Sequence, residues 1–226
     1  MEKNNLLENT EKLFEIVAVL ASSIGQKSRL KILQLLSQAP RSVENLAELS
    51  GESTANTSQH LQRLYKDGLV SVHKDRLSRI YSLRDERIAS FIENLLDLAE
   101  CISTDYLKCS NQITNDEIKN QKSIVEIIKE VKNKKAVLLD VRDEYEAECS
   151  PVTGALTIPL KKISSRAKSF SKSKIYYLFC RGRICHTASE GVQILRKLGF
   201  KAYRLHESPN TLKHLIKNDP NRSSYV

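Results

Sequence analysis

The chain has 226 residues, of which 40% are hydrophobic and 28% charged, and its formal net charge at pH 7 is +9. This length suits two small domains with separate cores. No apolar run approaches the length of a membrane-spanning helix, and residues 1–5 carry no signal-peptide pattern. The five cysteines are an odd number in a chain without an export signal. We therefore expect reduced thiols, a cytoplasmic location and no membrane partner.

The positive charge is unevenly distributed. Residues 1–110 hold 14 Lys/Arg against 15 Asp/Glu, a balance of −1, whereas residues 111–226 hold 22 against 12, a balance of +10. The excess suits an anionic substrate of the second half, and it could add non-specific attraction to nucleic acid. A solvated basic surface that favours solubility is the alternative interpretation.

The first 83 residues predict a run of helices that ends in a hairpin. Apolar residues recur at helical spacing, Pro40 and Gly51 interrupt the pattern, and the last two segments alternate like strands. The expected helices cover about 9–23, 26–37, 43–49 and 53–65, and the expected strands cover 69–73 and 79–83. This order is typical of a winged helix-turn-helix domain.

The helix at 53–65 has a polar outer face, and the hairpin is basic. Residues 53–84 hold six Lys/Arg against two Asp. Hydroxyl and amide side chains can hydrogen-bond base edges or phosphates in a major groove, and basic side chains on a wing can reach the DNA backbone or minor groove. The expected DNA-binding residues are Thr54, Asn56, Thr57, Ser58, Gln59, His60, Arg63, Lys74, Arg76 and Arg79. For one helix alone, an ordinary solvated face would be the better interpretation.

The runs Thr57–Leu64 and Asp67–Val70 resemble the recognition helix and wing of the ArsR-type winged-helix repressors. The resemblance covers about residues 10–105. It implies a homodimer that binds operator DNA and releases it on a metal or redox signal.

The sensing residues of that family are missing at the matching positions. The helix Val43–Glu48 lacks the cysteines of metal-sensing members, and the expected last helix, 86–107, lacks histidine. Cys101 could match one cysteine of the sulfide-sensing members, but Leu30–Leu36 offers no second one. A reactive group for signalling must therefore come from elsewhere in the chain.

The expected last helix is apolar on more than one face, which favours a dimer contact over packing within one chain alone. The polar run 109–116 predicts a linker. We thus expect a first domain over 1–110, a linker over 111–121 and a second domain over 122–217.

The second domain shows the rhythm of an α/β fold with a mainly parallel sheet. A helix is expected at 123–131 and strands at 136–141, 156–158, 175–179 and 202–205. The functional loops of such a sheet gather at the carboxyl ends of its strands, where Cys180 falls.

Cys180 stands between a buried strand and a helix that runs from about 188 to 198. Unpaired N–H groups at the helix start and the neighbouring arginines Arg181 and Arg183 are expected to lower the thiol pKa and favour the nucleophilic thiolate. A buried structural cysteine is the alternative. An arginine-dependent phosphatase mechanism is disfavoured, because His186 stands where that arginine would be needed.

This loop resembles the active-site loop of rhodanese (sulfurtransferase) domains, and the runs Ala136–Arg142 and Gly154–Leu160 resemble two further segments of that family. The resemblance implies a persulfide on Cys180 and a loop that holds an anionic sulfur donor such as thiosulfate or a persulfide. The expected substrate-binding residues are Arg181, Gly182, Arg183, Ile184 and Cys185. The loop departs from the family pattern, with Arg183 where a glycine is usual.

Cys185 could accept sulfur from Cys180 or form a disulfide with it, or it could pack as a small hydrophobe. Two cysteines at this spacing make a poor zinc site, and we expect neither a metal nor another cofactor.

The combined prediction is a sulfur- or redox-responsive regulator, expected to be a repressor, with two domains: a mainly-α winged helix-turn-helix domain and an α/β rhodanese-like domain. A thiosulfate or persulfide sulfurtransferase with an accessory winged helix is the main alternative. Metal sensing through cysteines 101, 109, 180 or 185 is a third.

Overall fold

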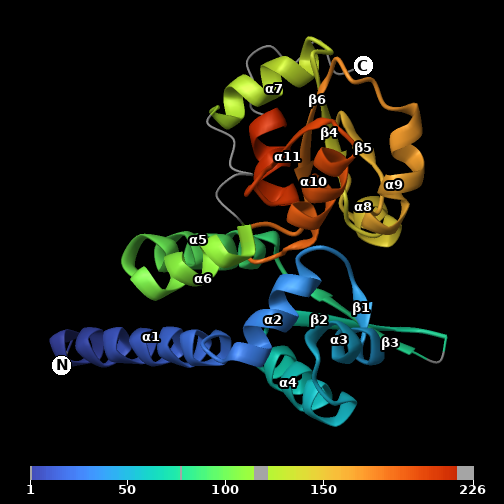
Figure 1. Ribbon diagram of the computed structural model, residues 1–226. Coiled ribbons are helices and arrows are strands. Elements are labelled where there is room, and N and C mark those ends of the chain that lie inside the picture. The colour runs from blue at the N-terminus through green and yellow to red at the C-terminus, as the bar shows by residue number, and fades with distance from the viewer. Residues whose placement is uncertain (1, 77, 115–121, 218–226) are drawn as a thin grey trace. The chain divides into compact units, whose positions relative to one another are not determined.

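A computed structural model describes residues 2–76, 78–114 and 122–217, which group into two compact units, Met1–Ile92 and Glu93–Val226 (Figure 1). Each unit has its own sheet and core, so the predicted fold class, a winged helix followed by an α/β domain, is confirmed. None of the described helices combines the length and the apolar character needed to cross a bilayer.

The first unit contains a helical cluster and a small antiparallel sheet. Its elements are α1 (Glu2–Ile24), α2 (Lys27–Leu36), β1 (Arg41–Ser42), α3 (Val43–Ser50), α4 (Thr54–Lys66), β2 (Val70–Asp75) and β3 (Ser78–Leu83). The sheet order is β1-β3-β2, and β1 was not predicted. Arg41 was interpreted as part of a helix break and Ser42 as the cap of the next helix, but the two residues also pair with Tyr81 and Ile80 of β3.

Side-chain caps set the starts of these helices. Ser42 and Ser53 accept hydrogen bonds from main-chain N–H groups three residues on, at the starts of α3 and α4. Gly51 ends α3 in the left-handed conformation, with φ of 73°. The core of this unit includes Ile32, Leu33, Leu46, Leu61 and Leu64, all fully buried.

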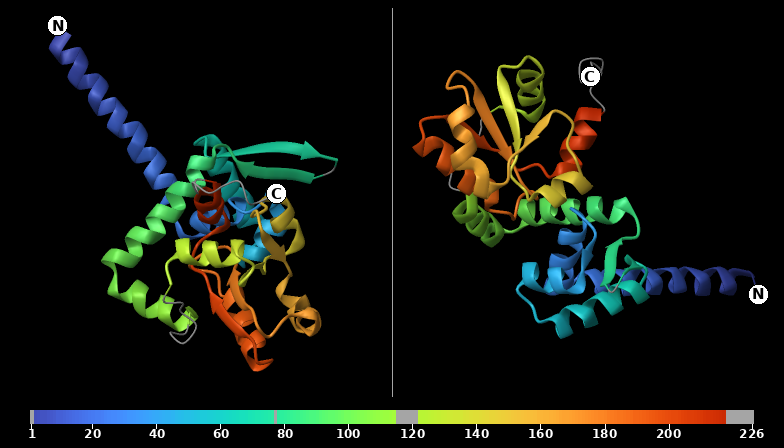
Figure 2. Two further views of the ribbon diagram at one scale, coloured as in Figure 1. Left: turned by 90° about the horizontal axis from the view of Figure 1, so that it is seen from above. Right: turned by 90° about the vertical axis from the view of Figure 1, so that its right-hand side faces the viewer.

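Helix α1 is longer than predicted, since the sequence indicated a start near residue 9. It projects as a straight rod from the rest of the first unit (Figures 1 and 2). The apolar face that the sequence predicted, Leu13, Ile16, Val17 and Leu20, is exposed.

The predicted helix 86–107 is two helices, α5 (Glu86–Ile102) and α6 (Thr104–Thr114). The break falls at Ser103, whose side-chain oxygen accepts a hydrogen bond of 3.1 Å from the N–H of Tyr106 and so caps α6. Residues 111–114 of the predicted linker are therefore helical, and 115–121 lie outside the described residues.

The second unit holds a parallel sheet of order β5-β4-β6-β7 with helices on both faces (Figures 1 and 2). The strands are β4 (Ala136–Asp140), β5 (Ala155–Thr157), β6 (Ile175–Phe179) and β7 (Lys201–Arg204). The helices are α7 (Ile124–Lys132), α8 (Glu144–Cys149), α9 (Ile163–Arg166), α10 (Thr187–Lys197) and α11 (Pro209–Lys217), with single 3-10 turns at Leu160–Lys162 and Ala167–Ser169.

Successive side chains of the two central strands point to opposite faces of the sheet, so the core of this unit has two layers. Tyr176 and Leu178 of β6 pack with α9 and α10, whereas Tyr177 and Phe179 pack with α7 and α11. Both faces of the sheet are thus buried, which is typical of parallel sheets. The loops that follow β4 and β6 begin at the carboxyl edge of this sheet.

Candidate functional site

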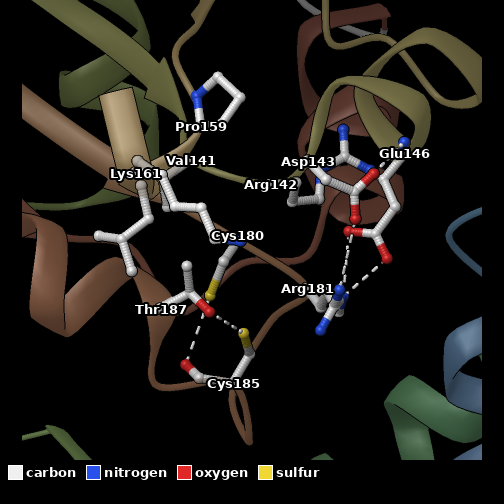
Figure 3. A pocket seen from close by; sticks show the side chains of 11 residues that line it. Val141, Arg142, Asp143, Glu146, Pro159, Lys161, Cys180, Arg181, Cys185 and Thr187 are labelled. Atoms are coloured by element: carbon white, nitrogen blue, oxygen red, sulfur yellow. Dashed lines mark hydrogen bonds and ion pairs between the residues drawn. The ribbon is translucent and has the colours of Figure 1, made fainter. Parts of the chain in front are cut away.

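The loop that joins β6 to α10 carries two thiols at the carboxyl edge of the sheet. Cys180 directly follows β6, is 1% exposed and belongs to the core layer under α10. Gly182 has φ of 107°, and its carbonyl accepts a hydrogen bond of 3.2 Å from the N–H of Cys185. This turn folds the loop back, so that Cys185 lies beside Cys180 (Figure 3).

Both cysteines line a cavity of about 270 Å³ that opens between β4, β6 and the start of α10 (Figure 3). Three carboxyl-end loops enclose it. Its lining residues are Val141, Arg142, Asp143, Glu146, Pro159, Leu160, Lys161, Cys180, Arg181, Cys185 and Thr187.

The two thiols differ in their environments. The Cys180 thiol donates to the main-chain oxygen of Cys185 over 3.3 Å, and burial raises the pKa of Cys180 well above its usual value. Hydrogen bonds of Cys185 with the Cys180 thiol, with Thr187 and with the N–H of Arg181 outweigh burial and lower the pKa of Cys185 to about 4. Burial thus opposes the expected thiolate on Cys180, whereas the loop amides and hydroxyl favour charge on Cys185.

The predicted substrate-binding arginines are both engaged by carboxylates. Arg181 donates to the fully buried Glu146 at 2.8 Å and lies 3.6 Å from Asp143. Arg183 forms ion pairs with Asp97, at 2.7 Å, and with Glu100, both on the part of α5 that belongs to the second unit.

Of the five predicted substrate-binding residues, Arg181 and Cys185 line the cavity. Gly182 supplies the turn of the loop, Arg183 contacts α5, and the side chain of Ile184 is 40% exposed.

The sequence did not single out three charged residues that shape this site. Arg142 donates to Asp140 at 2.6 Å, and both side chains are buried beneath the cavity. Glu146 fixes Arg181, and Arg204 of β7 lies under the loop. For Arg204 the sequence did contain a signal, because this arginine falls within the predicted strand 202–205, where a charged residue is unusual.

The other three cysteines, Cys101, Cys109 and Cys149, are exposed. Within residues 2–76, 78–114 and 122–217, no group of three His, Cys, Asp or Glu side chains is arranged to hold a metal ion.

The polar face of α4 and the β2–β3 hairpin present most of the predicted DNA-binding residues to solvent. Thr54, Gln59, Arg63, Lys74, Arg76 and Arg79 are exposed, and Asn56, Ser58 and His60 are partly exposed. Two of the polar groups have local partners: Asn56 donates to Glu52 at 2.7 Å, and Arg63 pairs with Asp67 at 2.7 Å.

Thr57 is a correction to the predicted DNA-binding set. Its side chain is fully buried, because it stands four and seven residues before Leu61 and Leu64 and so shares their inward face. Thr57 therefore belongs to the core of the first unit and not to the outer face of α4.

The fold and these two sites define a winged-helix protein of the DNA-binding class that carries a rhodanese-like α/β domain with two thiols in its loop. Residues 26–72 match the family model "Bacterial regulatory protein, arsR family", and residues 123–209 match "Rhodanese-like domain". The chain belongs to the ArsR family of bacterial regulatory proteins and is a transcriptional regulator of that type with a C-terminal rhodanese-like domain.

Two relatives illustrate the match. HTH-type transcriptional regulator Rv0324 of Mycobacterium tuberculosis is 27% identical over 203 residues, which cover 86% of each chain. HTH-type transcriptional regulator YgaV of Escherichia coli is 34% identical over 36% of this chain and 83% of its own length. Among solved structures, Rv0081 of M. tuberculosis is 27% identical with a TM-score of 0.40, over 42% of this chain and 96% of that chain.

Proposed function

We propose that this protein is a sulfur- or redox-responsive regulator, and specifically a repressor, whose signal is a persulfide or a disulfide formed at Cys180. The observation that carries the proposal is that two thiols share one cavity at the start of α10, where the Cys180 thiol donates a hydrogen bond to the main-chain oxygen of Cys185. The winged-helix domain offers no matching pair of cysteines, so the rhodanese-like domain supplies the reactive group.

The chemistry begins with proton transfer inside the pair. The Cys180 thiol passes its proton to the Cys185 thiolate, and the resulting Cys180 thiolate attacks the outer sulfur of a donor such as thiosulfate or a persulfide. A new S–S bond forms at Cys180, and the donor's S–S bond breaks with its electron pair leaving on sulfite or on a thiolate. The loop N–H groups stabilise the charge of the transferred sulfur.

A second step can follow at Cys185. Once deprotonated, its thiolate attacks the inner sulfur of the Cys180 persulfide, a Cys180–Cys185 disulfide forms, and hydrosulfide leaves. The loop then holds a cross-link in place of a persulfide. Either product changes the size and charge of the contents of the cavity.

Arg183 provides a route from the loop to the remainder of the regulator. Its ion pairs with Asp97 and Glu100 join the cysteine loop to α5 within the second unit, and the helical residues of α5 continue without interruption to Glu86 in the first unit. A change in the loop that alters these ion pairs would therefore act on α5. Coupling between two sites requires a contact that has two arrangements, and we assign that role to these ion pairs.

Operator binding by a homodimer is the second part of the proposal. Helix α1 exposes Leu13, Phe14, Ile16 and Val17, and α5 exposes Leu98 and Ile102. Soluble monomers rarely expose contiguous apolar surface of this kind, so we assign both helices to contacts with a second copy. The dimer would then present two α4 helices to two half-sites of an operator.

The test is intact-protein mass spectrometry after exposure to inorganic polysulfide, with operator binding measured on the same samples. The variants are Cys180→Ser and, as a matched control, Cys149→Ser, which alters an exposed cysteine outside the cavity. We expect sulfur adducts or a loss of two hydrogens, together with a change in operator affinity, in the wild type and in Cys149→Ser but not in Cys180→Ser.

Two other outcomes would reject the regulator in favour of alternatives. Adducts that leave operator affinity unchanged, with turnover of thiosulfate and cyanide, would indicate a sulfurtransferase with an accessory winged helix. A Cys180 that stays unmodified would refute the reactive loop.

A further inference from the structure

Arg204, at the end of β7, is the largest fully buried side chain of the described residues, with 2% of its surface exposed. Burial of a guanidinium is costly unless its charge and its N–H groups are matched. The burial of the charged Arg204 side chain is therefore not explained by packing in the core of the domain alone.

All the hydrogen-bond acceptors of Arg204 are neutral. Its guanidinium donates to the carbonyls of Arg183, at 2.8 Å, and Gly182, at 3.3 Å, and to the hydroxyl of Ser189 at 3.0 Å. Its Nε atom is buried and has no hydrogen-bond partner among the described residues. No described Asp or Glu forms an ion pair with it, in contrast to Arg142, Arg181 and Arg183, which each have a carboxylate.

Two of the three groups whose negative charge would favour the Arg204 cation are the loop thiols. Burial lowers the pKa of Arg204, and the opposing effects come from Cys180, from Cys185 and from Tyr106 of α6. The other positively charged residues that line the cavity are Lys161, Arg142 and Arg181. The charges of Arg142 and Arg181 are largely neutralised by their partner carboxylates, Asp140 and Glu146.

We infer that Arg204 is a positioning residue of the cysteine loop: its buried guanidinium holds the Gly182 and Arg183 carbonyls and supplies the positive charge that favours an anionic sulfur, thiolate or persulfide, on the Cys180–Cys185 pair. The inference rests on the proposed function only in taking this loop as the reactive site.

The contacts to two consecutive carbonyls also orient the loop. Each peptide unit is planar and trans, so its N–H points away from its C=O. By fixing the carbonyls of Gly182 and Arg183, Arg204 fixes the N–H directions of Arg183 and Ile184 on the opposite side of the chain. The same side chain thus sets both the charge and the geometry of the loop.

The test is the pH dependence of alkylation by iodoacetamide, resolved to Cys180 and Cys185 by peptide mass spectrometry, on the full chain without DNA or sulfur donor. Arg204→Gln removes the charge, and Arg204→Lys keeps it. Arg196→Gln is the matched control, because Arg196 also donates to a main-chain carbonyl, that of Ala202, but lies outside the cavity lining.

For Arg204→Gln, we expect the midpoint of Cys180 reactivity to rise by about one pH unit or more, so that the rate of Cys180 alkylation at pH 6, which lies below this midpoint, falls by about tenfold, while Arg196→Gln follows the wild type. Arg204→Lys should stay within about threefold of the wild type at pH 6. A folded Arg204→Gln with an unchanged pH profile would overturn the inference.

If Arg204→Gln does not fold, as judged by circular dichroism, Arg204→Lys decides the question, and a folded Lys variant that loses about tenfold at pH 6 refutes the role of the charge. These readouts are independent of sulfur transfer and operator binding. A failure of the regulatory proposal would therefore leave them unchanged, and a failure here would leave the sulfur-loading test intact.

Discussion

The thiol of Cys180 donates a hydrogen bond of 3.3 Å to the main-chain oxygen of Cys185, five residues further along the same loop. Burial disfavours charge on the Cys180 sulfur, whereas the loop hydrogen bonds favour charge on the Cys185 sulfur, and both residues line the same cavity. In the proposed function, Cys180 receives the sulfur and Cys185 resolves the persulfide.

Replacement of the second thiol should separate these two steps. With Cys185→Ser, we expect polysulfide to leave a stable persulfide on Cys180 and no loss of two hydrogens, because the resolving sulfur is absent. Intact mass before and after treatment with a thiol-specific label measures this. An internal cross-link that still forms in Cys185→Ser would show that another cysteine resolves the persulfide.

The lowered pKa of Cys185 predicts a reactive thiol well below neutral pH. Alkylation of Cys185 should already be fast at pH 6, since its pKa is about 4, and it should decline only as the pH approaches that value. An exposed cysteine such as Cys149 provides an internal comparison in the same spectrum. Equal pH profiles for Cys149 and Cys185 would contradict the loop electrostatics.

The same shift makes folding stability depend on pH. Because the pKa of Cys185 is lower in the folded state, its contribution is complete above the ordinary thiol pKa and is lost as the pH falls toward about 4. The free energy of unfolding should therefore rise with pH across this window, and this slope should be reduced in Cys185→Ser. The raised pKa of Cys180 has the opposite sign and opposes the rise above the ordinary thiol pKa. Urea unfolding at several pH values tests this.

Loss of the Arg183 side chain should uncouple sulfur chemistry from DNA binding. In Arg183→Ala the ion pairs with Asp97 and Glu100 are absent, so we expect sulfur loading as in the wild type but a smaller change in operator affinity. Arg166→Ala, an exposed arginine on α9, is the charge-matched control. A full response in Arg183→Ala would exclude this contact as the route.

The buried pair of Asp140 and Arg142 should be critical for folding of the second domain. Asp140→Asn removes the negative charge that Arg142 contacts in a site with almost no solvent exposure, and we expect a loss of about 3–5 kcal/mol. Glu144→Gln, which breaks an exposed pair with Lys162, should cost at most about 1 kcal/mol. Similar losses in the two variants would contradict the burial argument.

On the DNA side, Arg79→Ala in the exposed wing should weaken operator binding and reduce its salt dependence. Loss of one phosphate contact lowers the slope of log affinity against log salt by about 0.9. Lys168→Ala removes the same charge from an exposed position of the rhodanese-like domain and serves as the control. An unchanged slope in Arg79→Ala would remove this residue from the interface.

Local patterns were sufficient to predict most elements of both units. The capping serines Ser42 and Ser53 placed α3 and α4 closely, and the apolar runs placed β4 and β6. The errors arose where a tertiary contact decides the structure. Strand β1 forms only because β3 lies beside it, and Thr57 turns inward because the core of the first unit continues along that face of α4.

The candidate site was predictable in its position but not in its charge. The end of β6 placed Cys180 in the loop, as the strand pattern indicated. The partners of Arg181 and Arg183 stand 35 and 83 residues away in sequence, and Arg204 reaches the loop from the neighbouring strand. Such long-range pairings place the charged side chains around the loop, and a single sequence does not reveal them.

Under the proposed function, the small cavity around Cys180 would also limit which oxidants this regulator detects. With 1% of Cys180 exposed and about 270 Å³ of space in front of it, a donor has to bring its sulfur atom to the thiol through that opening. Compact inorganic sulfur species fit this requirement, whereas the disulfide bond of a folded protein is shielded by its own bulk. The protein would then not respond to the larger disulfides of the cell, and its selection among sulfur donors would depend on their molecular size as much as on their reactivity.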